Sequence, residues 1–157
     1  MSSDLRIEPL LDLAGGLDGL RRQAAGEGFR FLDRLEAEWR SGANRFAEPG
    51  EICLAACRAD DLIAVGGLNR DPYAGQDGIG RLRHLYVRQS ARRSGVGAAL
   101  VRQLLGHAEG VFHAVRLRTE TQEAAAFYVS LGFRCVQEQA ASHVMILRPR
   151  PHEASKQ

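Results

Sequence analysis

Apolar residues recur along the chain at two spacings, one typical of helices and one typical of strands. Residues 29–41 carry apolar side chains at three- and four-residue steps with charged side chains between them, and residues 17–26 have a similar pattern. Residues 96–109 form the clearest apolar stripe. Helices are therefore expected over these segments and over 123–131, where Gly132 would end the last one.

Shorter apolar or alternating runs predict the strands. Residues 52–59 and 62–68, joined by a tight Asp60-Asp61 turn, predict a hairpin. Further strands are expected over 5–10, 82–87, 115–119, 135–139 and 143–147. Residues 69–80, rich in Gly, Pro, Asp and Asn, predict a loop. The order strand, two helices, three strands, helix, strand, helix and strand pair predicts an α/β domain with a mixed sheet covered by helices.

The composition fits one such domain. A chain of 157 residues that is 45% hydrophobic and 25% charged is long and apolar enough to form one core. We expect the domain to span residues 1–147 and residues 148–157 to form a flexible tail. The net charge of +2 predicts no general attraction to nucleic acid. No run has the length of a leader or membrane span, so a cytoplasmic protein that acts away from membranes is expected.

The cysteines do not predict chemistry. Cys53, Cys57 and Cys135 are odd in number and irregular in spacing, which argues against a disulfide framework and against a metal site. Cys53 and Cys57 would lie on one face of a strand and act as small, buried apolar residues. A redox or nucleophilic role is the weaker alternative.

The most informative segment joins a predicted strand to the predicted helix over 96–109. Its sequence is Arg92-Arg93-Ser94-Gly95-Val96-Gly97. Glycines at a helix start let the backbone approach an anion, the first N–H groups point at it, and the two arginines add charge. No Gly-Lys-Ser/Thr follows the glycines, so a P-loop nucleotide hydrolase is excluded.

Two motifs together point to a family. The segment above matches Arg/Gln-x-x-Gly-x-Gly/Ala, and Ala124, Tyr128, Gly132 and Phe133 match Ala-x-x-x-Tyr-x-x-x-Gly-Phe. With both motifs in this order, the chain resembles the GNAT superfamily of acyl-CoA-dependent N-acetyltransferases over roughly residues 5–147. The resemblance implies a single GNAT-like domain. Its mixed, mostly antiparallel central sheet would have about six to seven strands, splayed at the central strand and flanked by about four helices.

The resemblance also implies acetyl-CoA as co-substrate. Its pyrophosphate would meet N–H groups between Arg93 and Ala98, and its pantetheine arm would pair with the end of the strand before them. An N–H near Val87 would polarise the acetyl carbonyl. The residues expected to contact acetyl-CoA are Leu85, Tyr86, Val87, Arg92, Arg93, Ser94, Gly95, Val96, Gly97, Ala98 and Thr121. Thr121 replaces an asparagine that is common in the family.

Catalysis would rest on a tyrosine. Tyr128 matches the family's general acid, which would protonate the CoA thiolate after direct attack by a primary amine. The alternative is a helix tyrosine packed on Phe133. Many members carry a glutamate base where this chain has Arg81, and arginine cannot act as a base. Arg81 and Arg83 would bind a substrate anion, or Arg81 would lie at the wet entrance of the strand with no specific role. Glu120 is the best carboxylate candidate for a base.

Three further expectations concern the acceptor side. His84 should face the opposite side of the strand from Arg81 and Arg83, in a structural role under a helix. The loop that begins at Asn69 would carry specificity. Phe29, Phe31 and Trp39 would either line the acceptor pocket or pack in the core, and core packing is the stronger expectation.

The sequence leaves the acceptor and the class of protein open. The acceptor would be a small amine, an amino acid-like molecule or a protein or peptide amine. Without the strand glutamate, a non-catalytic acyl-CoA-binding regulatory module is the alternative to an enzyme. An arginine-rich nucleic-acid binder is a third hypothesis, disfavoured by the balanced charge. A homodimer is possible, although no self-complementary apolar patch stands out.

Overall fold

The computed structural model of the protein describes residues 4–13 and 17–147. In chain order its elements are β1 (Leu5–Pro9), α1 (Leu17–Gly26), α2 (Phe31–Ser41), β2 (Ile52–Arg58), β3 (Asp61–Arg70), β4 (Ile79–Val87), η1 (Gln89–Ala91), α3 (Val96–Ala108), β5 (Ala114–Leu117), α4 (Gln122–Ser130), β6 (Arg134–Glu138) and β7 (Ala141–Ile146). The order of helices and strands is the predicted one. The tail expected over 148–157 lies outside the described residues.

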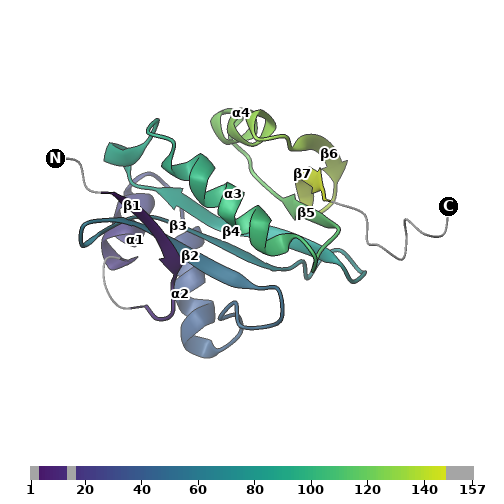
Figure 1. Ribbon diagram of the computed structural model, residues 1–157, viewed down its shortest axis with the longest axis horizontal. Coiled ribbons are helices and arrows are strands. Elements are labelled where there is room, and N and C mark those ends of the chain that lie inside the picture. Colours follow the sequence, from purple (N-terminus) through teal and green to yellow (C-terminus); the bar gives the residue numbers. More distant parts are fainter. Residues whose placement is uncertain (1–3, 14–16, 148–157) are drawn as a thin grey trace.

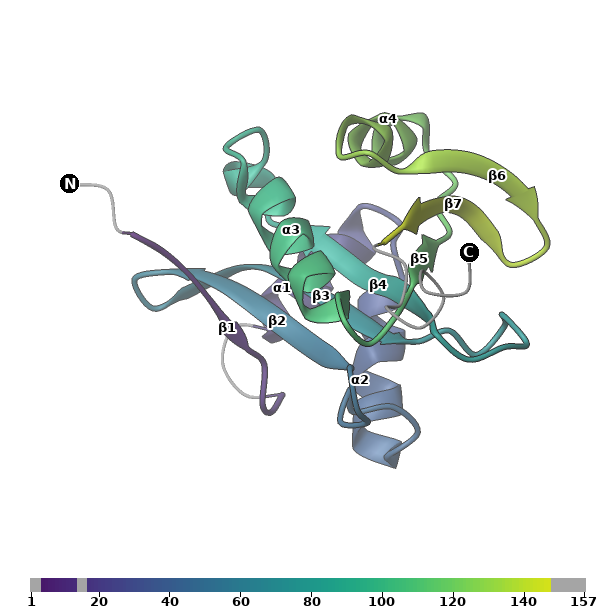
Figure 2. The same cartoon turned by 45° about the vertical axis from the view of Figure 1, so that its right-hand side comes forward.

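The strands form one seven-stranded sheet in the order β1-β2-β3-β4-β5-β7-β6 (Figure 1). Every neighbouring pair is antiparallel except β4 and β5, which run parallel. Helix α3 lies across one face of the sheet, whereas α1 and α2 cover the other face (Figures 1 and 2). The predicted mixed, mostly antiparallel sheet flanked by helices is confirmed.

Two apolar cores lie on opposite faces of the sheet because strand side chains alternate in direction. In β2, Leu54 packs in the α3 core and Cys53 packs in the α1–α2 core. Leu100 and Leu104 of α3 are fully buried in the first core. The central strands are therefore covered on both faces, which explains their nearly continuous apolar sequence.

The predicted loop over 69–80 was too long. Asn69 pairs with Arg81, and Arg70 pairs with Gly80, so these residues extend the β3–β4 ladder. A Cβ at Gly80 would come within 2.8 Å of the Phe112 ring, so glycine is needed there for packing. The turn-like composition therefore misled the prediction. Helix α2 likewise begins two residues later than predicted.

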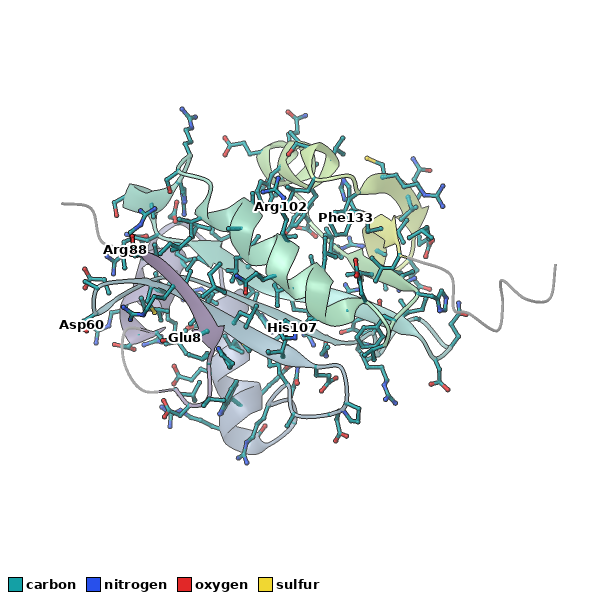
Figure 3. The ribbon with its side chains drawn as sticks, viewed as in Figure 1. Glu8, Asp60, Arg88, Arg102, His107 and Phe133 are labelled. Carbon is teal, nitrogen blue, oxygen red and sulfur yellow. The ribbon has the colours of Figure 1, made fainter. Side chains whose placement is uncertain are left out.

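The end of α4 follows the prediction. Gly132 has φ of +105°, a left-handed conformation that glycine adopts without strain. The Phe133 N–H donates to the Tyr128 carbonyl at 3.1 Å, and the two rings meet edge to face with centroids 5.5 Å apart. Phe133 therefore folds back at the junction between α4 and β6 (Figure 3).

The three cysteines have different surroundings. Cys53 and Cys57 pack in the same core, as predicted from strand alternation, and burial raises the pKa of the Cys53 thiol to about 12. Cys57 is only half-buried, and Cys135 is exposed with its sulfur 3.5 Å from His143 Nε2. Within residues 4–13 and 17–147, no helix is long and apolar enough to cross a membrane.

Candidate active site

The central strands β4 and β5 part shortly after they meet. They pair only at Ile79–Ala114, Gly80–Val115 and Arg81–Arg116. Beyond Arg81, strand β4 continues to Val87 with β3 as its neighbour, and no other described strand pairs with its second edge. The expected splay at the central strand is therefore present.

The open edge of β4 presents backbone hydrogen-bonding groups. Arg88 donates its N–H to Ile63 of β3 at 2.7 Å. Because successive residues in an antiparallel ladder alternate in direction, Val87 points its N–H and carbonyl away from β3. The Val87 carbonyl accepts a hydrogen bond from Arg92 Nε at 2.9 Å. The Val87 N–H therefore points to the edge where β4 has no partner strand among the described residues, as a strand edge that pairs with a ligand requires.

A bulge in β4 overturns the expectation for His84. The ladder pairs Val65 with Tyr86 and Gly67 with Arg83, so β4 holds one residue more than β3 between these pairs. His84 occupies the bulge with φ of +61°. The extra residue turns His84 to the same α2-facing side as Arg83, not to the opposite side. His84 is buried, with the Phe31 backbone of α2 beside its imidazole and the Phe46 ring edge-on to it, and its expected structural role stays a prediction.

The turn before α3 has the backbone geometry that the expected anion site requires. Gly95 caps the helix with φ of +85°, and the side of Gly95 where a Cβ would stand is open. The N–H groups of residues 93–98 find no protein acceptor in the part of the chain that the structure describes. A row of free N–H groups at a helix start, together with the helix dipole, attracts a phosphate. The structure therefore places a run of unpaired N–H groups at the start of α3, as the motif predicted.

The two arginines of this turn have different surroundings. Arg92 binds Glu27, the residue after α1, through two hydrogen bonds of 2.6 and 2.9 Å, and its guanidinium lies 5.3 Å from the centre of the Tyr86 ring. These bonds, with others from Tyr86 and Gln89, lower the pKa of the Glu27 carboxyl to about 2. The Arg92 side chain thus braces the turn against α1. Arg93 is exposed and makes no ion pair with a described residue.

Tyr86 also belongs to the α1 side. Its hydroxyl donates to Glu27 and lies 3.1 Å from Gln23 Oε1, and burial together with Glu27 raises its pKa to about 12. Because residues 86 and 87 alternate, the N–H and carbonyl of Tyr86 point toward β3, with which it pairs at Val65. The predicted contact of Tyr86 with the cofactor stays a prediction.

Tyr128 sits on α4 in the core beside α3. Its side chain contacts Phe127, Phe133 and His143, and it is 7% exposed. Burial raises the pKa of its hydroxyl well above the usual value, so the group keeps its proton at neutral pH. The hydroxyl has no hydrogen-bond partner among the described residues and is not fully enclosed by protein.

Thr121 caps the helix that carries Tyr128. Its Oγ1 accepts the Ala124 N–H at 3.1 Å, which is the ordinary role of an N-cap threonine. The hydroxyl hydrogen stays free to donate. The sequence comparison with the family's asparagine did not anticipate this capping role.

The side chain of the candidate base Glu120 is exposed to solvent. Its side chain is 81% exposed and pairs with Arg118 at 3.6 Å. No hydrogen bond or ion pair joins it to Tyr128 or to β4 among the described contacts. The structure therefore does not bring the two predicted catalytic side chains together.

Arg81 is held by a buried carboxylate that the sequence did not single out. Asp71 is buried and accepts from Arg81 at 3.4 Å and from Arg116 at 2.9 Å. Arg81 also stacks on Tyr73, 4.9 Å from the ring centre. Burial lowers the pKa of the Arg81 guanidinium, and Asp71 opposes that effect. The alternative of a wet strand entrance was wrong, since Arg81 is only 7% exposed.

This ion cluster marks the point where β4 and β5 part. Arg81 and Arg116 form the last paired position of the two strands, and Arg116 also reaches Glu138 of β6 at 2.6 Å. Asp71 ties the loop after β3 to both strands. The local sequence pattern did not indicate this ion cluster, because Asp71 lies in a polar loop and Arg116 lies in an ordinary alternating strand.

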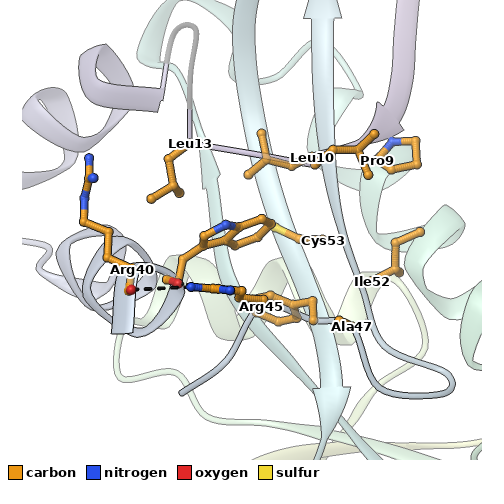
Figure 4. Close-up of a pocket in the computed structure, with 11 residues that line it drawn as sticks. Pro9, Leu10, Leu13, Arg40, Arg45, Ala47, Ile52 and Cys53 are labelled. Atoms are coloured by element: carbon orange, nitrogen blue, oxygen red, sulfur yellow. Dashed lines mark hydrogen bonds between the residues drawn. The ribbon is translucent and has the colours of Figure 1, made fainter. Parts of the chain in front are cut away.

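A cavity of about 760 Å³ opens beside α2, between the end of β1 and the start of β2 (Figure 4). Trp39 and Phe46 line it, together with Leu10, Ile52 and Cys53. Arg45 crosses one side and donates to the Trp39 carbonyl at 2.7 Å. Trp39 thus lines a pocket, whereas Phe29 and Phe31 pack on one another and toward Tyr86, as core residues do.

Comparisons with known proteins agree with this geometry. Residues 49–135 match the family model of the acetyltransferase (GNAT) domain. A candidate acetyltransferase of Exiguobacterium sp. 255-15 is 29% identical, with a TM-score of 0.82 over 91% of this chain and 93% of that one. A search among curated proteins found no match.

Two more distant structures share the fold. A GNAT acetyltransferase of Brucella melitensis in complex with acetyl-CoA is 15% identical, with a TM-score of 0.69 over 94% of this chain and 90% of its own. Glucosamine-6-phosphate N-acetyltransferase of Arabidopsis thaliana is 16% identical, with a TM-score of 0.60 over 88% of this chain and 97% of its own. The family model spans more than half of the 157 residues. The chain therefore belongs to the GNAT family of acetyltransferases, whose co-substrate is acetyl-CoA.

Proposed function

We propose that this protein is an N-acetyltransferase that moves the acetyl group of acetyl-CoA to a primary amine by direct attack. Residues 1–147 would form the catalytic domain. The observation that carries the proposal is the row of unpartnered N–H groups over residues 93–98, next to the open edge of β4. Phosphate at the helix start and an extended amide arm along the strand edge suit these two features.

The chemistry needs polarisation of the thioester carbonyl and a proton for the leaving thiolate. Backbone N–H groups toward Val87 are fixed donors for the developing oxyanion. Tyr128 supplies the proton, because its burial keeps the hydroxyl protonated and its hydroxyl has no partner among the described residues. The amine then forms the new C–N bond as the C–S bond breaks. The ammonium proton leaves through water, with exposed Glu120 as the candidate base behind that water.

The experiment is thiol release with acetyl-CoA and a panel of amines, amino acids and peptides. We expect Tyr128→Phe to lower kcat by about 100-fold or more, the usual contribution of a general acid, while acetyl-CoA still binds with unchanged Kd. Tyr73→Phe is the matched control, since Tyr73 is exposed and stacks only on Arg81. Full activity of the Tyr128→Phe variant would show that Tyr128 is not the general acid.

A non-catalytic acyl-CoA-binding module is the second candidate. The observation in its favour is Arg81, which stands at the usual base position and is neutralised by Asp71. Under this alternative, calorimetry detects acetyl-CoA binding and no acceptor releases CoA thiol. Acceptor-dependent thiol release by the unmodified protein would exclude it.

A further inference from the structure

Polar atoms without partners gather in one interior region on the α2-facing side of the sheet. Most of the buried side-chain nitrogen and oxygen atoms that lack a hydrogen-bond partner lie there, within the part of the chain that the structure describes. They are Glu38 Oε1, Asn44 Nδ2, Asn69 Oδ1 and both ring nitrogens of His84. Buried polar groups are normally paired because an unmade hydrogen bond forfeits the hydration of the group. A concentration of such atoms beside β4 is therefore a candidate place for a polar ligand.

Contacts and strand alternation place these residues on one side of the sheet, most of them around Phe46. Gly67 and Asn69 of β3 face α2, since a Cβ at Gly67 would meet the Phe46 ring and strand residues alternate. His84 lies edge-on to Phe46, with ring centroids 6.1 Å apart. Asn44 uses its Oδ1 to accept the Phe46 N–H at 2.9 Å, which leaves its Nδ2 free. We call this group of residues the bulge site.

Two of these side chains are too deeply buried to be solvated at the surface. His84 is 7% exposed and Asn69 is 6% exposed, and none of the atoms named above makes a well-formed hydrogen bond, although the Phe31 backbone of α2 lies close enough to the imidazole to oppose the lowering of its pKa. His84 is also held in a left-handed backbone conformation, which a residue with a Cβ adopts only when its surroundings enforce it. The bulge thus directs an imidazole into the interior at the strand along which the acetyl group would lie.

The bulge site has an acidic half and a basic half. Arg83 lies 13% exposed with its Nη2 3.8 Å from Glu38 Oε1, a distance too long for a hydrogen bond. Neither side chain satisfies the other, and Arg83 makes no hydrogen bond with any described residue. Burial, with Arg83 as the second cause, lowers the pKa of His84 to about 3, so its imidazole is neutral and offers one acceptor nitrogen.

We propose that the bulge site binds the acceptor as an amino acid-like zwitterion, with its ammonium group on Glu38, Asn69 and His84 and its carboxylate on Arg83 and Asn44. The proposal rests on the amine acetylation proposed above. Three acceptor atoms match the three N–H donors of an ammonium group, and the Arg83 guanidinium with the Asn44 amide matches a carboxylate. Arg81, already held by Asp71, takes no part. The cavity beside α2 shares Phe46 as a wall with this site, so it is the nearest space for an apolar side chain of the acceptor.

A binding experiment tests the site without any turnover. The histidine side-chain nitrogen resonances of the full chain are followed while each standard amino acid, its amide and its decarboxylated amine are titrated, with and without acetyl-CoA. His84→Gln assigns the resonances. We expect amino acids to shift the His84 resonances and amides or amines to bind at least tenfold more weakly. Unshifted His84 resonances, or equal binding of the decarboxylated amines, would overturn the proposal.

Kinetics of thiol release supply the second test. We expect Glu38→Gln to raise the KM of the amino acid at least tenfold while the KM of acetyl-CoA stays unchanged. Glu36→Gln makes the same change on the outer side of α2, where Glu36 pairs with Arg21 and Arg40, and should alter neither constant. Arg83→Gln should abolish the preference for an amino acid over its amide.

The two proposals fail differently. Acetylation of amines that is indifferent to Glu38 and Arg83 would overturn the bulge site and leave the N-acetyltransferase standing. Amino acids that shift His84 without any release of CoA thiol would overturn the transferase and support the bulge site. Circular dichroism on each variant separates loss of binding from loss of the fold.

Discussion

At the scale of single residues, His84 combines a strained backbone conformation with a strongly lowered pKa. Its pKa of about 3 in the folded protein lies far below the 6.5 of an unperturbed histidine, because burial and Arg83 oppose its protonation. Between these values the unfolded chain binds the proton and the folded chain does not. The free energy of unfolding therefore falls as pH drops below 6.5 and is unaffected by this group above it.

We predict that His84→Gln flattens this pH dependence. One proton bound only by the unfolded state gives a slope of about 1.4 kcal/mol per pH unit, and the variant loses that slope between pH 6 and pH 4. Urea unfolding at several pH values measures it. His107→Gln, on the exposed face of α3 (Figure 3), should leave the slope as it is. An unchanged slope in His84→Gln would contradict the assignment of His84 as buried and neutral.

Glu27 adds a further acid-labile contribution of the same sign to the free energy of unfolding between pH 4.5 and about 2, because its folded pKa is lowered.

A glycine gives the second prediction at this scale. A Cβ at Gly67 would stand 2.6 Å from the Phe46 ring, so Gly67→Ala should lower the free energy of unfolding by about 1–3 kcal/mol through overpacking. Gly106→Ala in α3 meets nothing within 4 Å and should raise stability by about 0.5–1 kcal/mol. Chemical denaturation compares the two variants. Equal effects would mean that Phe46 moves aside freely.

At the scale of elements, the unpaired backbone at the start of α3 is the feature on which the proposed anion site rests. Gly95 holds a left-handed conformation at the helix start, and the N–H groups of residues 93–98 have no acceptor among the described residues. The two hydrogen bonds between Arg92 and Glu27 hold this turn to the end of α1. The helix, the turn and these hydrogen bonds together present donors without requiring a side chain to move.

Substitutions at Gly95 separate charge from backbone strain. Gly95→Glu places a carboxylate among the free N–H groups and should weaken acetyl-CoA binding at least 100-fold, which corresponds to about 2.7 kcal/mol. Gly95→Asn tolerates a positive φ and adds no charge, so it should retain binding within tenfold. Calorimetry with acetyl-CoA gives both values. Equal affinity of the glutamate variant and the unmodified protein would refute the anion site.

At the scale of the whole molecule, the sheet divides at the junction of β4 and β5. Strands β1 to β4 carry α1, α2 and α3, whereas β5, β7 and β6 continue beside α4 (Figure 2). The junction consists of three paired positions and the ion cluster around Asp71. Because the strands part beyond it, the edge of β4 and the start of α3 stay open to one ligand.

Hydrogen exchange tests this division. We expect the amides of Val87 and residues 93–98 to exchange quickly in the free protein and to be protected at least tenfold when acetyl-CoA is bound, because they gain acceptors. The amide of Arg88, already bonded to Ile63, serves as the internal reference and should change little. Protection that is uniform across the sheet would point to global stabilisation by the ligand rather than to contact at this edge.

The sequence by itself determined the order of the elements and the glycine turn before α3. These depend on local periodicity and on glycines whose backbone role follows from neighbouring residues, as at Gly95 and Gly132. Strand alternation also placed Cys53 and Cys57 on one face correctly.

Only the tertiary structure decided what the side chains do at the site. A one-residue bulge turned His84 to the face of Arg83, and strand alternation cannot foresee a bulge. Asp71 pairs with Arg81 and Arg116, although its loop is far from β5 in sequence. Arg92 pairs with Glu27 instead of extending into solvent. Such pairings arise from which segments pack together, so they depend on the fold as a whole, and no local pattern encodes them.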